Sequence, residues 1–268
     1  MHRYPLAIKR ETFAITSAVL GVVTVVTGLS LGIIAYDNSN TTTYSLLNHF
    51  VSELGWAKMS SGAWIFNLSI ALAGVMFIPL LWEMGRHLGT RLGWVTTAIG
   101  IGTAVTGSLI GMVPMDRIGP HVAVACFYFW GLLFMAIMFA AAIWFSPVRQ
   151  QAKGPLLISF ALFVLCLVFG MAPKGSLARA AINIGTFKRP DVWNLAIMEW
   201  SVVILTVFWV LTIAVYLLMR QKNWGQVRCE LRTAHGKPAP LQYQSGVPPS
   251  PRLRRACEPP TLPKRCAR

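Results

Sequence analysis

The chain is 268 residues long, and 55% of its residues are hydrophobic whereas only 12% are charged. Average proteins carry about 25% charged residues, so a disordered chain, a coiled coil and an ordinary soluble enzyme domain are excluded. The formal net charge of +15 leaves two classes, a membrane protein with basic ends or a nucleic-acid binder, and the position of the charge distinguishes them.

Six apolar runs follow a short N-terminal segment, residues 1–12. Each run is long enough to cross a bilayer as a helix, which takes about 20 residues, and almost no charged residue lies inside. The runs lack both the polar face of a soluble helix and the alternation of a β-barrel strand. The sequence therefore predicts an all-α, polytopic membrane protein, a six-transmembrane-helix bundle over residues 13–219. The expected spans are 13–36, 63–82, 92–113, 121–145, 155–173 and 193–219.

The basic residues favour one orientation of this bundle. An even number of spans places both termini on one side, and that side carries 18 of the 24 Lys and Arg residues. Because an excess of Lys and Arg marks cytoplasmic segments, we expect both termini to be cytoplasmic.

The segment 220–268 differs in composition from the rest of the chain. It holds eleven basic residues, two acids and eight of the 16 prolines, so we predict a disordered cytoplasmic tail. Such a tail is either a solvated segment that fixes topology or a polybasic segment attracted to anionic lipid head groups. Nucleic-acid binding is disfavoured because no recognition motif accompanies the charge.

Small residues in two spans predict where helices approach closely. Gly28 and Gly32 form one small-xxx-small pair, and Gly107 and Gly111 form another. Such pairs allow the backbones of transmembrane helices to pack against each other.

Near the end of the second span, Glu83 is spaced to meet Arg86 and His87 on the next helical turn. We interpret this group as an ion pair at the membrane interface.

Polar residues gather on the side opposite the termini. Five of the nine acids lie in or beside the outer loops: Asp37, Glu53, Asp116, Asp191 and Glu199. Because His49, His121, Asn48, Ser52, Asn67 and Asn194 join them, we expect a single cluster at the outer leaflet. Specifically, Glu53, Asp116 and His121 should line one outward-facing cavity.

The first outer loop, residues 44–56, has apolar positions at helical spacing. We predict a short amphipathic helix on the membrane surface that ends at Gly55. His49 and Glu53 are four residues apart on its polar face and could lie side by side. That polar face either contributes to a site or simply meets water.

The second outer loop contains two titratable groups between prolines, Asp116 and His121. Asp116 could cap the fourth helix or pair with Arg117, and His121 begins an otherwise apolar span. In the sixth span, Glu199 is either interfacial or, if buried, requires a partner such as Lys174 or His121.

Three motifs in this order carry a resemblance to a known family: Ser52-Glu53-Leu54-Gly55, Asn67, and the loop Pro114-x-Asp116…His121. They resemble a bacterial and archaeal membrane family, domain-of-unknown-function family 998, over about residues 10–219. The resemblance implies a multi-pass fold, with no established activity, in the bacterial inner membrane. A fainter similarity is to the Frag1/DRAM/Sfk1 membrane proteins, some of which act in lipid remodelling or distribution; it concerns the fold alone.

The polar cluster permits functions of three classes. The first is a non-catalytic bundle that binds a membrane lipid or a partner through the outer residues. The second is a lipid-modifying enzyme with acid–base residues among His49, Glu53, Asp116 and His121 and with Ser52 as nucleophile if a histidine reaches it. Substrate-binding candidates for such a site are Asn67, Lys174, Lys188, Arg189 and Glu199.

The third class is a small transporter, which the lack of ionisable residues in the middle of the spans disfavours. We expect no cofactor, because nucleotide-binding glycine loops and haem motifs are absent from the sequence. A metal site is chemically possible from two histidines and a carboxylate, but no metal-binding motif is present and none is predicted.

Overall fold

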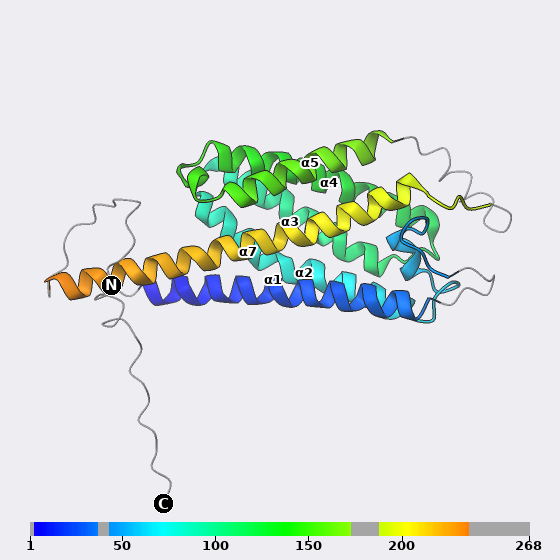
Figure 1. The fold of residues 1–268 in the computed structure, drawn as a ribbon, viewed down its shortest axis with the longest axis horizontal. Helices are drawn as coiled ribbons and strands as arrows, with labels where there is room; N and C mark the ends of the chain where they lie inside the picture. Colours follow the sequence, from blue (N-terminus) through cyan, green and yellow to red (C-terminus); the bar gives the residue numbers. More distant parts are fainter. Residues whose placement is uncertain (1–2, 37–42, 173–187, 236–268) are drawn as a thin grey trace, which may run out of the picture. The chain divides into compact units, whose positions relative to one another are not determined.

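A computed structural model describes residues 3–36, 43–172 and 188–235; for residues 3–7 and 222–235 it describes the backbone only. The described chain contains six long helices and two short 3₁₀ helices (Figure 1): α1 (Arg3–Ile34), η1 (Val51–Gly55), α2 (Ala63–Leu88), α3 (Arg91–Met112), α4 (Ile118–Trp144), η2 (Pro147–Gln150), α5 (Lys153–Met171) and α7 (Asn194–His235). All six long helices are long and apolar enough to cross a membrane. The predicted all-α, six-span architecture is therefore confirmed.

Residues up to Tyr216 form one compact unit and the remainder a second, and the helix bundle with its loops belongs to the first. Between consecutive helices, local residues end one helix and begin the next. Gly89 ends α2 in the left-handed conformation with φ 60°, and the Thr90 hydroxyl accepts a hydrogen bond from Gly93 N–H at 3.0 Å to cap α3. These are standard stop and start signals of helices.

Small residues bring the helices together where the sequence predicts. A Cβ atom at Gly28 of α1 would collide with Ser69 of α2, and one at Gly111 of α3 would collide with the Asn67 carbonyl of α2. Large apolar side chains cover the outside of every span, among them Val23, Val75, Phe127, Phe160 and Phe208. A bilayer would satisfy this surface.

The bundle has two different ends. At the end that we call the short-loop end, only residues 89–90 and 145–152 connect the helices. The other, which we call the long-loop end, carries η1 and the segments 43–62, 113–117 and 188–193 (Figure 1).

Helix α7 continues to His235, so residues 220–235, which we expected to be disordered, are helical in the described chain. They are rich in helix-forming residues, and the first proline after Arg220 is Pro238. The rest of the expected tail, residues 236–268, lies outside the described residues.

Candidate functional site

The first loop at the long-loop end is not the wetted amphipathic helix that its spacing predicts. Only Val51–Gly55 is helical, and it forms a 3₁₀ turn. The side chains of His49 and Glu53 are buried, whereas the apolar Leu46 and Leu47 are exposed.

Backbone groups that an α-helix would pair internally are bound here by distant residues. The Leu47 carbonyl accepts from Trp193 N–H at 2.8 Å, and the His49 carbonyl accepts from the Trp200 indole at 3.1 Å. The distant donors therefore satisfy buried backbone carbonyls that this non-helical segment cannot pair within itself.

A bidentate ion pair fixes this loop to the segment that precedes α7. Arg189 donates to both carboxylate oxygens of Glu53, at 2.8 and 2.9 Å, and donates to the Asn48 carbonyl at 2.8 Å. Glu53 also accepts from Phe50 N–H at 3.0 Å. Burial lowers the pKa of the Arg189 guanidinium, but its hydrogen bond to and attraction by Glu53 raise that pKa on balance. Arg189, a candidate for substrate binding in the sequence analysis, is instead paired with Glu53.

A second carboxylate holds η1 from the side of the bundle. Glu199 of α7 accepts a hydrogen bond from Val51 N–H at 2.9 Å, and the Ser52 backbone and hydroxyl donate to it as well. Its side chain is buried, with 9% of the residue exposed. The partner of Glu199 is thus the backbone of η1 and Ser52. Of the partners that we expected, Lys174 lies outside the described residues, and no hydrogen bond to His121 is present among the described ones.

Aromatic residues surround His49, which is 2% exposed. Its ring lies 4.9 Å from that of Tyr44 and 5.5 Å from that of Tyr36, and its Nδ1 lies 3.2 Å from both backbone polar atoms of Ser45. Burial and the nearby Arg189 lower the pKa of His49, so the ring is neutral at pH 7. His49 does not meet Glu53 through a hydrogen bond in the described chain.

The tyrosines and Trp200 are site residues that sequence reasoning missed. The Tyr44 hydroxyl donates to the Phe50 carbonyl at 2.9 Å. Burial, and next the charge of Glu53, raise the pKa of Tyr36 to about 12; burial also raises that of Tyr44. Both phenols are therefore neutral, and their role is to enclose the ion pair. An aromatic residue next to a polar loop is the only signal that could have indicated them.

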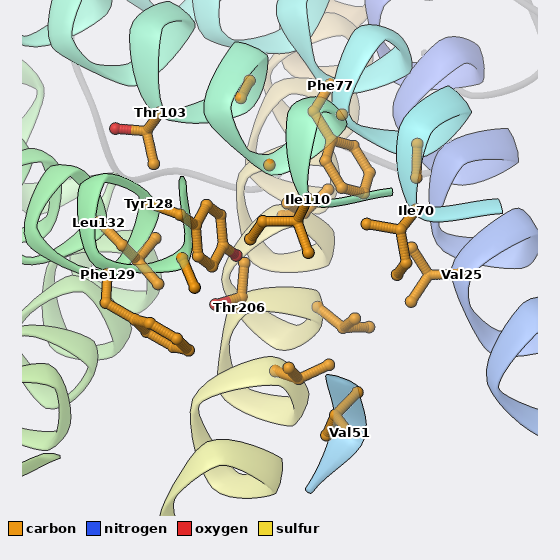
Figure 2. Close-up of a pocket in the computed structure, with 18 of the residues that line it drawn as sticks. Val25, Val51, Ile70, Phe77, Thr103, Ile110, Tyr128, Phe129, Leu132 and Thr206 are labelled. Atoms are coloured by element: carbon orange, nitrogen blue, oxygen red, sulfur yellow. The ribbon is translucent and has the colours of Figure 1, made fainter. Parts of the chain in front are cut away.

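Between η1 and the middle of the bundle, the helices surround a largely apolar cavity (Figure 2). Its volume, counted as the space that the centre of a water molecule can reach, is about 140 Å³. Side chains from α1, α2, α3, α4, α7 and η1 line it, including Val25, Val51, Ile70, Phe77, Ile110, Phe129 and Leu132. The Tyr128 ring and the Thr206 hydroxyl lie next to each other deep in this cavity.

The polar residues at the long-loop end of the cavity are Ser52, His121 and Glu199. Along α7 the lining runs from Glu199 to Val210, which at 1.5 Å per residue is roughly 16 Å. The cavity is therefore elongated along the bundle axis.

The expectation that Glu53, Asp116 and His121 line one cavity is wrong for two of the three. Only His121 lines it, with Nδ1 donating to the Val113 carbonyl at 2.7 Å. Glu53 is directed to Arg189, and Asp116 is exposed and accepts from Ala57 N–H at 3.1 Å. Asp116 therefore fixes the loop before α2, and its side chain does not cap α4.

The remaining candidate site residues either hold a loop in place or lie on the surface, away from the cavity. Asn67 donates to the Gly55 carbonyl at 3.0 Å and holds the end of η1. Lys188 and Asp191 are exposed, and Asp37 and Lys174 lie outside the described residues.

The geometry gives little support to acid–base chemistry. Within the described ranges, no hydrogen bond joins the Ser52 hydroxyl to His49 or His121; its partner is Glu199. Nor do any three His, Cys, Asp or Glu side chains among the described residues come close enough to hold a metal ion.

Comparison with protein families identifies the architecture. A family model described as "Protein of unknown function (DUF998)" matches residues 24–216. The chain belongs to this family. That match contains η1, both carboxylates that hold it and all the cavity-lining residues. No curated protein and no solved structure matches the chain.

Proposed function

We propose that this DUF998 protein binds a membrane lipid, with an acyl chain in the cavity and the polar head group at the long-loop end. The observation that carries the proposal is the cavity itself. Apolar side chains line most of its length, with Tyr128 and Thr206 as polar residues among them, and its ionisable side chains His121 and Glu199 lie with Ser52 at one end. This distribution matches an amphiphile.

The dimensions of the cavity support the same reading. Its length of roughly 16 Å along α7 is close to half of the ~30 Å hydrocarbon core, the depth of one leaflet. The volume of about 140 Å³ is far above the ~10–15 Å³ that one water molecule requires, and an apolar cavity of this kind favours an apolar occupant over water.

Two substitutions on α4 test the proposal. Ala125 lines the cavity, whereas Ala123 is exposed on the same helix and does not line it. Ala125→Phe fills the cavity, and Ala123→Phe adds the same ring to the surface.

Mass spectrometry of lipids extracted from the purified full chain measures what each variant retains. We expect the unsubstituted protein and Ala123→Phe to retain a stoichiometric lipid and Ala125→Phe to lose it. Equal retention by both variants, or no lipid in the unsubstituted protein, would refute lipid binding in this cavity.

We also propose that both termini are cytoplasmic, which places the head-group end at the outer leaflet. The excess of Lys and Arg on the terminal side supports it. Lys188 and Gln150 are exposed at opposite ends of the bundle. A membrane-impermeant thiol reagent should label Lys188→Cys in intact cells and Gln150→Cys only after lysis; the reverse pattern would invert the topology.

A further inference from the structure

The polar end of the cavity offers hydrogen-bond acceptors. Glu199 is a carboxylate that Val51 N–H and Ser52 already bind. The Val113 carbonyl can only accept, so the proton of a neutral His121 is on Nδ1 and its Nε2 is an acceptor. Ser52 uses its hydroxyl proton on Glu199, which leaves its lone pairs to accept.

The acidic group at this end is the Glu199 carboxyl, and among the described residues no cationic side chain faces it in the cavity. No Lys or Arg side chain lines the cavity in the part of the chain that the structure describes. The cation of the neighbouring loop, Arg189, makes a bidentate pair with Glu53 outside the cavity. A phosphate or carboxylate head group would therefore lie beside an acidic side chain with no cation to pair with it, and an unpaired anion in a site of low dielectric constant is strongly disfavoured.

We propose that this end of the cavity binds the protonated amine of a long-chain amphiphile. A primary ammonium carries three N–H donors and a positive charge, which suit the acceptors Ser52 and His121 and the carboxylate of Glu199. The apolar lining below, shown in Figure 2, takes its hydrocarbon chain. This inference rests on the lipid-binding function proposed above and adds the class of head group.

Three probes with the same chain length separate the head groups: dodecylamine, dodecanol and dodecanoate. Each is titrated into the full chain in maltoside micelles, and native mass spectrometry measures the concentration at half occupancy. We expect dodecylamine to reach half occupancy at a concentration at least about ten-fold below that of the alcohol or the acid, because the desolvated ion pair adds to the hydrogen bonds. Ala125→Phe should lower the occupancy by all three probes, which locates the binding in the cavity.

Glu199→Gln removes the charge and keeps a side-chain oxygen that can accept from Val51 N–H, so η1 remains anchored. We expect this variant to lose the preference for the amine. Glu83→Gln is the matched control, because Glu83 is also buried but does not line the cavity; its preference should equal that of the unsubstituted protein.

Two results overturn the head-group inference while leaving lipid binding intact. One is that dodecanoate or dodecanol binds as tightly as dodecylamine, and the other is that Glu199→Gln retains the preference. If none of the three probes binds in the unsubstituted protein, the proposed lipid-binding function fails as well.

Discussion

The two ends of the bundle use their charged residues differently. At the short-loop end, Glu83 meets Arg86 one helical turn away at 3.7 Å, with the Arg86 side chain 39% exposed, and His87 lies 3.6 Å from Glu11 of α1. At the long-loop end, Glu53 binds Arg189 through two bonds shorter than 3 Å across 136 positions of the sequence. The ion pairs at the short-loop end join side chains of helices whose backbone groups are already hydrogen-bonded within the helix. The Glu53–Arg189 pair at the long-loop end instead holds in place a segment that is not an α-helix.

The reason for the difference lies in the backbone. Non-helical chain next to a bilayer leaves peptide groups that lipid cannot satisfy. Between α2 and α3 the connection is so short that Gly89 and Thr90 complete it. Around η1, the peptide groups of Leu47, His49 and Val51 find partners on α7 or just before it. Long loops near a membrane thus require distant polar side chains, and these also shape the end of the cavity.

Removing one arginine at each end should give the largest contrast. Arg189→Ala leaves the buried Glu53 carboxylate without its cation, which costs about 3–5 kcal/mol of unfolding free energy. Glu83 is buried too, but Arg86 is 39% exposed and lies 3.7 Å from it, beyond hydrogen-bond distance, so Arg86→Ala should cost less than about 1 kcal/mol. Unfolding of the full chain in mixed micelles measures both, and similar losses would show that the two ends do not differ.

In contrast, enlarging a closely packed glycine should lower the unfolding free energy by a similar amount at both ends. A Cβ atom at Gly85 would meet Thr97 at the short-loop end, and one at Gly111 would meet Asn67 at the other, whereas Gly102 has nothing within 4 Å. We expect Gly85→Val and Gly111→Val each to cost about 1–3 kcal/mol by overpacking. Gly102→Val, on the same helix as Gly111, should change the unfolding free energy by less than about 1 kcal/mol. A large cost at only one of the two ends would contradict the view that polar contacts alone distinguish them.

The same contrast explains what the sequence could predict. The spans, the close glycines and the Glu83–Arg86 pair all follow from local spacing, and the structure contains them. Local spacing does not predict the hydrogen-bond partners of Glu53 and Glu199. Both carboxylates bind peptide N–H groups, which every residue type except proline carries, so the sequence does not reveal which residue is the donor. The position of the acids in the sequence was sufficient to predict that polar residues cluster at the long-loop end. It was not sufficient to distinguish the residues that line the cavity from those that hold the loops in place.

One tryptophan at each end, with an indole hydrogen bond at the long-loop end and a ring contact at the other, provides a finer comparison. Trp200→Phe keeps an aromatic ring, although a smaller one, but leaves the buried His49 carbonyl without its donor, so we expect a loss of about 1–2 kcal/mol. The same substitution at Trp82, which is half-exposed and stacks edge-on with Trp94 at the short-loop end, should cost less than about 0.5 kcal/mol. The two values come from the micelle unfolding assay, and an equal loss at Trp82 would assign the effect to ring packing instead.

The smallest expected effect is a dependence of stability on pH that arises at the long-loop end. Burial, with the neighbouring Arg189 cation, lowers the pKa of His49 below its ordinary value of 6.5. Just below pH 6.5, His49 is therefore protonated in the unfolded chain but remains neutral in the folded protein. The stability that neutral His49 contributes is complete above about pH 6.5 and is lost as the pH falls through the folded-state pKa.

His49→Gln removes this titration while retaining a polar side chain near Ser45. The unfolding free energy of the unsubstituted protein should decline between pH 7.5 and 5.5, and the decline should be shallower in the variant. Because the short-loop end contains titratable groups of its own, the difference between the two curves is the relevant measurement. Parallel curves would mean that protonation of His49 does not disturb the loop, and the buried ring would then be a packing element that tolerates either charge state.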